Sequence, residues 1–85
     1  MPQVTIYTKP YCPYCIRAVS VLEEKGVDFT EIDAAFDPAL RQEMMQRSGR
    51  STYPQIFVGD QHIGGCDDLL ELDRAGRLDP LLQAA

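Results

Sequence analysis

Two cysteines stand three positions apart near the start of the chain. Cys12 and Cys15 lie in the stretch TKPYCPYC, and Lys9 precedes the first of them by three residues. Thiols at this spacing are used in three ways: they bind a metal, form a structural disulfide, or exchange disulfides with a substrate. In disulfide exchange one thiolate attacks a sulfur of the substrate, and the second cysteine resolves the mixed disulfide. The rest of the sequence has to distinguish these uses.

The cysteine count and the start of the chain argue against a structural disulfide. Three cysteines are an odd number and too few for a disulfide-rich secreted domain. The opening MPQVTIYTK also lacks the succession of basic, apolar and small residues that marks a secretory signal. We therefore expect a reducing, cytoplasmic compartment, in which a close cysteine pair is typical of catalysis or metal binding.

Composition limits the class of protein further. The 85 residues are 45% hydrophobic and 25% charged, as in ordinary globular proteins, and we expect a single domain over residues 1–85. The formal net charge of −5 argues against nucleic acid or an acidic membrane surface as a partner. No apolar run approaches the roughly 20 residues that cross a bilayer. We expect a monomer that acts on neither nucleic acid nor membranes.

The elements that must position the cysteines follow from the apolar pattern and its breaks. Continuous β-branched and aromatic runs predict buried strands, apolar residues at helical spacing predict helices, and glycine and proline mark the ends. We predict strands at 3–8 and 27–33, a helix at 13–25, a second helix between Asp37 and Gly49, two short strands around Gly59 and Asp60, a helix from Cys66 to before Gly76, and a short helical turn at 78–82.

The order βαβαββα predicts an α/β protein. The first three elements form a parallel βαβ unit, because parallel strands need a crossover connection. The strands around Gly59 and Asp60 then add an antiparallel hairpin. The expected result is a four-stranded mixed sheet flanked by helices on both faces. Burial on both faces agrees with the nearly continuous apolar runs VTIY and QIFV.

Within this arrangement the two cysteines of the pair differ. Cys12 is expected at the strand-to-helix turn, where unpaired backbone N–H groups and the helix dipole favour a thiolate. Cys15 shares an apolar stripe with Ala18, Val19 and Leu22, so we expect its thiol to be buried and poorly ionised. This asymmetry favours disulfide exchange, in which Cys12 attacks and Cys15 resolves.

Zinc binding is the alternative that needs weighing. Cys12, Cys15, Cys66 and His62 form a nominal set of three cysteines and one histidine. A closed tetrahedral site requires all four ligands to turn toward one point, whereas Cys15 is expected to face the core. His62 alternates with Ile63 on a short strand and is expected at the surface. We therefore predict that the chain has no metal site.

Three motifs together resemble the dithiol glutaredoxins. CPYC at 12–15, TYPQIF at 52–57 and GGCDDL at 64–69 match that family in identity, order and spacing, and the resemblance is closest to its short bacterial members. It implies a thioredoxin-like (glutaredoxin) fold and a glutathione-dependent thiol–disulfide oxidoreductase of cell redox homeostasis. Implied substrates are glutathione mixed disulfides and disulfide-containing proteins. Glutathione would be a co-substrate, glutathione reductase an indirect partner, and no cofactor would be bound permanently.

The resemblance also implies where glutathione binds. Its γ-glutamyl carboxylate would meet the backbone N–H groups of Cys66 and Asp67 at a helix start, and the Asp67 side chain would pair the ammonium group. The backbone before Pro54, a proline held in cis, would pair with the cysteinyl part as a strand edge does. Lys9 would reach the glycine carboxylate. The full implied set is Lys9, Tyr14, Thr52, Tyr53, Pro54, Gly65, Cys66 and Asp67.

Several charged residues near this set have a second interpretation. Asp67 and Asp68 are favourable in the first turn of a helix even without a ligand. Arg50 is a weaker candidate for the glycine carboxylate, and it otherwise belongs with Arg41 and Arg47 to a solvated face. The sequence leaves these interpretations open.

One residue departs from the family, and three others have no assigned role in it. Tyr53 stands where the family most often has valine. We expect glutathione binding to persist, because it uses the backbone, and substrate preference to shift, because the larger ring narrows the site. Met44 and Met45 are assigned to the core. Cys66 is either an inert helix-start residue or a site of regulatory oxidation.

Two other functions fit parts of the pattern. A small redoxin reduced by thioredoxin reductase would share the cysteine pair but would have no need of the GGCDD pocket. An iron–sulfur carrier of the same fold usually has glycine and serine where this chain has Pro13 and Cys15. Glutathione-dependent exchange therefore fits the sequence better than either.

Overall fold

The structure is a computed structural model that describes residues 2–83. Its elements are β1 (Val4–Thr8), α1 (Pro13–Glu24), β2 (Phe29–Asp33), α2 (Pro38–Ser48), β3 (Gln55–Val58), β4 (Gln61–Gly64), α3 (Cys66–Arg74) and α4 (Leu78–Gln83). All predicted elements are present. The turn expected at 78–82 is a six-residue helix, so the order is βαβαββαα. β2 begins at Phe29 rather than at 27, because β1 starts at Val4, whose partner in the sheet is Phe29.

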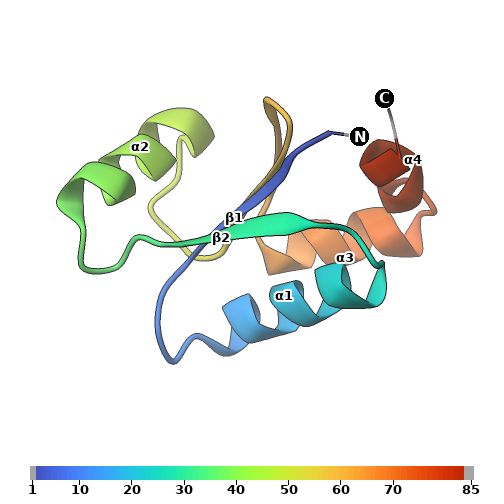
Figure 1. Cartoon of the computed structure of the whole chain (residues 1–85), viewed down its shortest axis with the longest axis horizontal. Helices are drawn as coiled ribbons and strands as arrows, with labels where there is room; N and C mark the ends of the chain where they lie inside the picture. Colours follow the sequence, from blue (N-terminus) through green and yellow to red (C-terminus); the bar gives the residue numbers. More distant parts are fainter. Residues whose placement is uncertain (1, 84–85) are drawn as a thin grey trace.

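The four strands form one mixed sheet in the order β2-β1-β3-β4. β1 pairs with β2 in parallel, and β1–β3 and β3–β4 are antiparallel, as the sequence predicts. Helices α1 and α3 lie on one side of the sheet and α2 on the other (Figure 1). Within residues 2–83 no helix is long and apolar enough to cross a bilayer.

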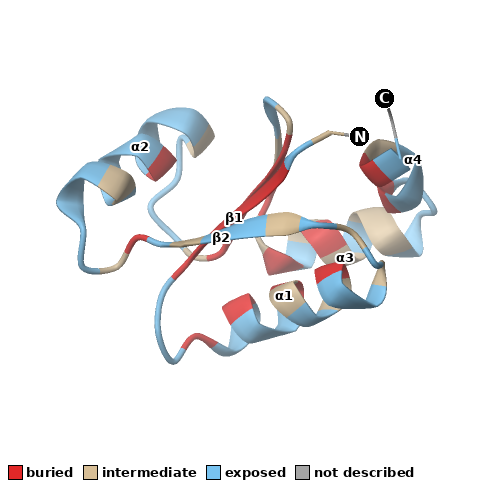
Figure 2. Ribbon diagram, viewed as in Figure 1, coloured by how far each residue is buried: buried red, intermediate tan, exposed pale blue. Residues whose placement is uncertain are grey.

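Each face of the sheet has its own buried cluster, because neighbouring strand residues point to opposite sides. On the α1 and α3 side the cluster consists of Val4, Ile6, Ala18, Leu22, Ile56, Val58, Cys66, Leu69, Leu78 and Leu82. Under α2 a smaller cluster, which we call the α2-side cluster, consists of Tyr7, Ala34, Met44 and Phe57. The residues of the two central strands are all buried, as the red ribbon of β1 in Figure 2 illustrates, and they contribute side chains to both clusters, which explains their continuous apolar sequences.

The helix ends that frame the site are set by local signals. Cys12 is the N-cap of α1, and Pro13 occupies the first helical position. Asp37 caps α2, accepting hydrogen bonds from the N–H groups of the second and third helical residues at 3.0 and 3.3 Å. Gly49 ends α2 with a positive φ of 71°, which glycine adopts without steric cost. These ends agree with the sequence predictions.

One assignment on α2 was wrong. Met45 is 40% exposed, and only Met44 belongs to the core, because α2 touches the sheet along a narrow stripe. Arg47 is exposed, as the sequence predicts, but its guanidinium also has specific partners. Its guanidinium lies 4.2 Å from the centre of the Phe57 ring and donates a 2.8 Å hydrogen bond to Tyr7 Oη. A planar guanidinium stacks on aromatic rings while keeping its polar donors satisfied, so it can cover the edge of an apolar cluster.

Candidate active site

The first wall of the site is the start of α1. Cys12 has extended backbone angles, and its carbonyl accepts the first helical hydrogen bond from Ile16 N–H at 3.0 Å. Its Sγ accepts a hydrogen bond from Cys15 N–H at 3.2 Å. A sulfur in this position receives a helix-start N–H and the positive end of the helix dipole, both of which stabilise negative charge. The geometry therefore suits a nucleophilic thiolate at Cys12.

Exposure does not separate the two thiols, since Cys12 is 4% and Cys15 3% exposed. The surroundings of the two sulfur atoms, by contrast, differ. Burial raises the pKa of the Cys15 thiol to about 12, and the neighbouring Cys12 sulfur adds to the rise. Both cysteines are free thiols in the structure. Cys15 is thus held protonated near neutral pH.

We expect iodoacetamide at pH 7 to alkylate Cys12 and to leave Cys15 unmodified. Only the thiolate reacts, and a pKa of about 12 keeps Cys15 protonated until the solution becomes strongly alkaline. Burial also raises the pKa of Cys66, so it should react slowly as well. Peptide mass spectrometry after timed alkylation measures the three rates, and the Cys12→Ser variant is the control. Labelling of Cys15 as fast as Cys12 would contradict the assignment.

The second wall is the start of α3. Gly65 is the N-cap of this helix, and Asp67 and Asp68 occupy its first turn. The Gly65 N–H donates a 2.9 Å hydrogen bond to Asp68 Oδ2, which fixes the turn that enters the helix. This bond, with the Arg50 guanidinium second, lowers the pKa of the Asp68 carboxyl. The first N–H groups of a helix have no partner within the helix, so those of Cys66 and Asp67 suit an anion.

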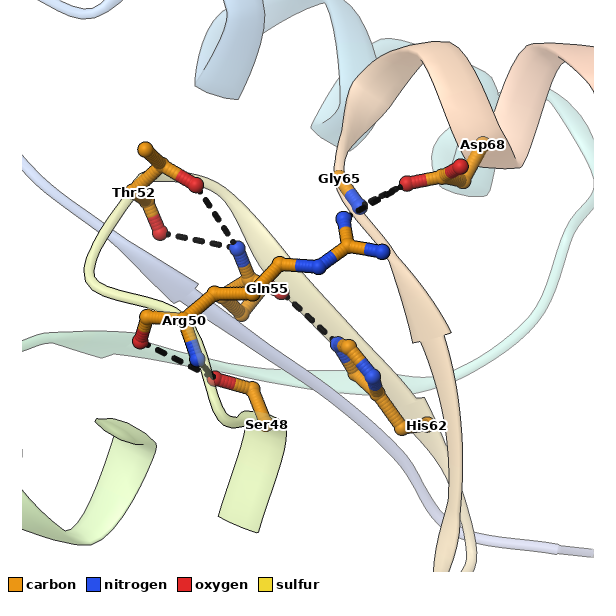
Figure 3. Close-up of polar contacts among 7 residues, drawn as sticks. All are labelled: Ser48, Arg50, Thr52, Gln55, His62, Gly65 and Asp68. Atoms are coloured by element: carbon orange, nitrogen blue, oxygen red, sulfur yellow. Dashed lines mark hydrogen bonds and ion pairs between the residues drawn. The ribbon is translucent and has the colours of Figure 1, made fainter. Parts of the chain in front are cut away.

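The third wall is the loop between α2 and β3, held by a chain of side-chain bonds (Figure 3). Gln55 Nε2 donates to the carbonyl oxygen and to Oγ1 of Thr52, at 3.0 and 3.1 Å. A carbonyl only accepts, so the amide must turn its oxygen toward His62 Nε2, 2.7 Å away. His62 therefore carries its proton on Nε2. Burial lowers the pKa of His62, which favours the neutral imidazole with its single proton on Nε2.

His62 thus differs from its predicted place at the surface. It is half-buried, its ring centre is 5.0 Å from that of Phe57, and it bonds to Gln55. Of the nominal zinc set, His62 is bonded to Gln55. Among the described residues no three Cys, His, Asp or Glu side chains come together to hold a metal ion.

Residues from the three walls line a cavity of about 210 Å³ that is open to solvent. Its lining consists of Tyr14, Arg50, Thr52, Tyr53, Pro54, Gly65, Cys66, Asp67 and Asp68. Every residue of the implied glutathione set is therefore here except Lys9. Lys9 lines a second cavity of about 540 Å³, together with Tyr11, Cys15 and Ile16. The tertiary structure brings together segments that lie about 40 to 50 residues apart in the sequence.

Tyr53 lines the cavity and also has contacts outside it. The Tyr53–Pro54 peptide bond is cis, as the family resemblance implies. The Tyr53 ring packs against the α2-side cluster, and Lys9 Nζ lies 5.7 Å from the ring centre. Its Oη is buried and has no hydrogen-bond partner among the described residues. The effect of this ring on substrate preference stays a prediction.

The backbone at position 64 adopts a conformation that requires glycine. Its φ is 120°, and a Cβ built there would overlap the Asp68 carboxylate. We expect Gly64→Ala to lower the free energy of unfolding by about 3 kcal/mol, since it adds backbone strain and displaces the helix cap. Gly26→Ala is the matched control, because Gly26 has a φ of 69° but open space around it. Its expected cost is about 1 kcal/mol.

Urea unfolding of both variants measures the difference, and equal losses would show that the Asp68 contact contributes nothing.

Sequence reasoning missed the support that Asp68, Gln55 and His62 give to this site. For Asp68 a signal existed, because an acidic residue three positions after an N-cap is typical of a capping box. For Gln55 and His62 no local signal exists, since their contact depends on the pairing of β3 with β4.

The fold and the site together define a class of protein. A Cys-x-x-Cys pair at the start of the helix that follows the first strand, in a βαβ unit of a small mixed sheet, is the arrangement of a thioredoxin-fold thiol–disulfide oxidoreductase. The loop that carries a cis proline and the start of α3 add a second binding wall to that arrangement.

Comparison with known proteins gives the family. The Glutaredoxin family model matches residues 4–63. The chain is 56% identical to a glutaredoxin of Pseudomonas aeruginosa, over 99% of this chain and 100% of that protein. It also matches the solution structure of glutaredoxin from Brucella melitensis, with a TM-score of 0.86 and 58% identity over 98% of this chain and 90% of that one. The chain belongs to the glutaredoxin family, and it is a glutathione-dependent thiol–disulfide oxidoreductase.

A third relative bears on the ligand. A buckwheat glutaredoxin has been solved in complex with glutathione, and it superimposes on this chain with a TM-score of 0.84. Its sequence is 33% identical, over 93% of this chain and 74% of that one. Glutathione is thus bound by a glutaredoxin of the same fold.

Proposed function

We propose that Cys12 alone reduces glutathione mixed disulfides and that Cys12 and Cys15 together reduce protein disulfides. The observation that carries this proposal is the cavity beside the start of α1, whose lining joins the Thr52–Pro54 loop to the first turn of α3. Glutathione acts as a co-substrate in this scheme and not as a permanently bound cofactor. The proposed setting is cytoplasmic, and the active unit is a monomer.

In the one-thiol route the Cys12 thiolate attacks the glutathionyl sulfur of a mixed disulfide. The Cys12–glutathione disulfide forms, and the target leaves as a thiolate that takes a proton from water. A second glutathione thiolate then attacks the glutathionyl sulfur of this adduct. Glutathione disulfide leaves, the Cys12 thiolate returns, and glutathione reductase restores two glutathione molecules at the expense of NADPH.

In the two-thiol route Cys12 attacks a protein disulfide and becomes joined to one of its sulfurs. Cys15 then attacks Cys12 Sγ, which releases the protein as a dithiol and leaves a Cys12–Cys15 disulfide. Cys15 must lose its proton at this step, and its burial makes that costly until the substrate is in place. Two glutathione molecules reduce the enzyme disulfide stepwise. The nearness of Cys12 Sγ to the Cys15 backbone, 3.2 Å, supports the ring closure.

The proposed glutathione site assigns its parts as follows. The γ-glutamyl carboxylate binds the N–H groups of Cys66 and Asp67, and the Asp67 carboxylate pairs the ammonium group. The backbone of Thr52 and Tyr53 pairs with the cysteinyl residue, next to the cis proline Pro54. In addition, Tyr14 packs beside the sulfur, Gly65 keeps the turn open, and Lys9 reaches the glycine carboxylate. This assignment is supported by the position of Lys9 Nζ, which lies 5.7 Å from the ring centre of Tyr53, a residue of the cavity lining.

A coupled assay tests the proposal. NADPH consumption is followed with glutathione, glutathione reductase and the mixed disulfide of cysteine and glutathione as substrate. Turnover that saturates with this substrate is the expected result. A parallel reaction contains thioredoxin reductase in place of glutathione and its reductase, and we expect it to remain at background. Reduction through thioredoxin reductase alone would mean that the cavity is not a glutathione site.

A further inference from the structure

An ion pair joins two walls of the cavity. Arg50 Nη1 donates to Asp68 Oδ2 at 2.9 Å, and the two side chains come from the α2–β3 loop and the first turn of α3. Figure 3 shows the Arg50 side chain extending from the loop toward Asp68 and the Gly65 backbone. The same Asp68 oxygen accepts the Gly65 N–H. We call this contact the Arg50–Asp68 bridge.

The charges around the cavity give the bridge a consequence for an anionic ligand. Its lining contains two carboxylates, Asp67 and Asp68, and among the described residues of the lining only Arg50 is positively charged. A ligand carboxylate that approaches the N–H groups of Cys66 and Asp67 lies close to the Asp68 carboxylate. Without Arg50, the Asp68 carboxylate would repel the ligand carboxylate at short range in a partly desolvated site. Asp67 is matched by the ammonium group of glutathione, but Asp68 is not.

We propose that Arg50 is a positioning residue for glutathione binding. By pairing with Asp68, it neutralises the carboxylate beside the anion site and ties the Thr52–Pro54 loop to the start of α3. This inference rests on the proposed function. Its expected effect is on substrate affinity, because neither side chain of the bridge takes part in the exchange of sulfurs.

The bridge is not primarily a stabilising contact. The Arg50 and Asp68 side chains are 48% and 45% exposed, and ion pairs at such positions contribute little to stability. Arg50 also lies in a loop, outside both buried clusters. The variants at this position should therefore fold, and their kinetics can be compared directly.

Three variants separate the possible roles of Arg50. Arg50→Met leaves Asp68 unpaired, and we expect KM for the cysteine–glutathione mixed disulfide to rise about tenfold with kcat within about twofold of wild type. Arg50→Lys keeps the charge and should hold KM within about threefold. The double variant Arg50→Met/Asp68→Asn removes both charges and should return KM to within about threefold of wild type. Arg41→Met, on the exposed side of α2, is the matched control and should change neither constant.

The outcomes are distinct. An unchanged KM in Arg50→Met would overturn the inference, as would a loss confined to kcat. A double variant as impaired as Arg50→Met would also overturn it, because Arg50 would then bind the ligand itself rather than act through Asp68. Failure of the wild-type protein to turn over with glutathione would instead refute the proposed function, and it would be seen before any variant is compared. Recovery in the double variant, with normal thermal unfolding throughout, is the result expected.

Discussion

Changing Cys12 to serine is expected to lower turnover of a glutathione mixed disulfide by about 10⁴-fold or more. A serine hydroxyl does not ionise near neutral pH, so the helix start that stabilises a thiolate has no anion to act on. The fold should survive the change, because serine is among the best N-cap residues and can accept the N–H that Cys12 Sγ accepts now. The loss would therefore report chemistry rather than unfolding.

The coupled NADPH assay measures this loss, and thermal unfolding of the variant shows that it is folded. Cys12→Ala is a useful companion, because it removes the cap as well as the nucleophile. Both variants should be inactive, whereas only Cys12→Ala should lose stability, by about 1 kcal/mol. Substantial turnover in either variant would place the nucleophile elsewhere, and Cys66, the remaining thiol beside the cavity, would be the next candidate.

Changing Cys15 has the second large effect, and it should separate two activities. We expect Cys15→Ser to reduce glutathione mixed disulfides at a rate similar to that of wild type, since that route needs one thiol. Reduction of a disulfide-containing protein should fall on the order of 100-fold or more. An intramolecular thiol held beside Cys12 acts at a far higher effective concentration than glutathione in solution. Without it, the mixed disulfide with the protein waits for glutathione.

Cys15→Ala is the matched control for this experiment. Cys15 is buried, so serine places a hydroxyl in an apolar setting at a cost of about 1–3 kcal/mol, while alanine does not. The two variants should share the same loss of protein-disulfide reduction and differ only in stability. Both activities are measured in the same coupled assay with the two substrates in turn. Loss of both activities in both variants would refute the one-thiol route.

Much of the fold was predictable because its signals are local. A helix cap acts within three or four residues, so Cys12 with Pro13, Asp37 and Gly49 mark helix ends that need no distant partner. Continuous apolar runs predict strands buried on both faces, and the chain order of the elements then restricts the sheet to few topologies. The contrast between Cys12 and Cys15 also follows from local position, one at the N-cap and one on the apolar stripe of α1.

The tertiary structure alone decided which polar groups support the site. The Arg50–Asp68 bridge and the bond between Gln55 and His62 join residues whose nearness depends on how β3 pairs with β4 and how α3 leaves the sheet. The register of that pairing shifts between Ile56 and Phe57, and no local pattern in the sequence specifies such a shift.

The same reason explains the placements that sequence reasoning got wrong. Met45 was assigned to the core from residue type, yet its exposure depends on which narrow stripe of α2 meets the sheet. His62 was assigned to the surface from local alternation, yet its burial depends on how β4 pairs with β3. The role of Lys9 in glutathione binding stays a prediction, because its side chain lies over Tyr53 and lines the second cavity. By itself, the sequence determined the reactive pair, the helix ends and the chemistry. The side chains around the pair come from segments that are distant in the sequence, so only the packing of the tertiary structure decided which of them lie there.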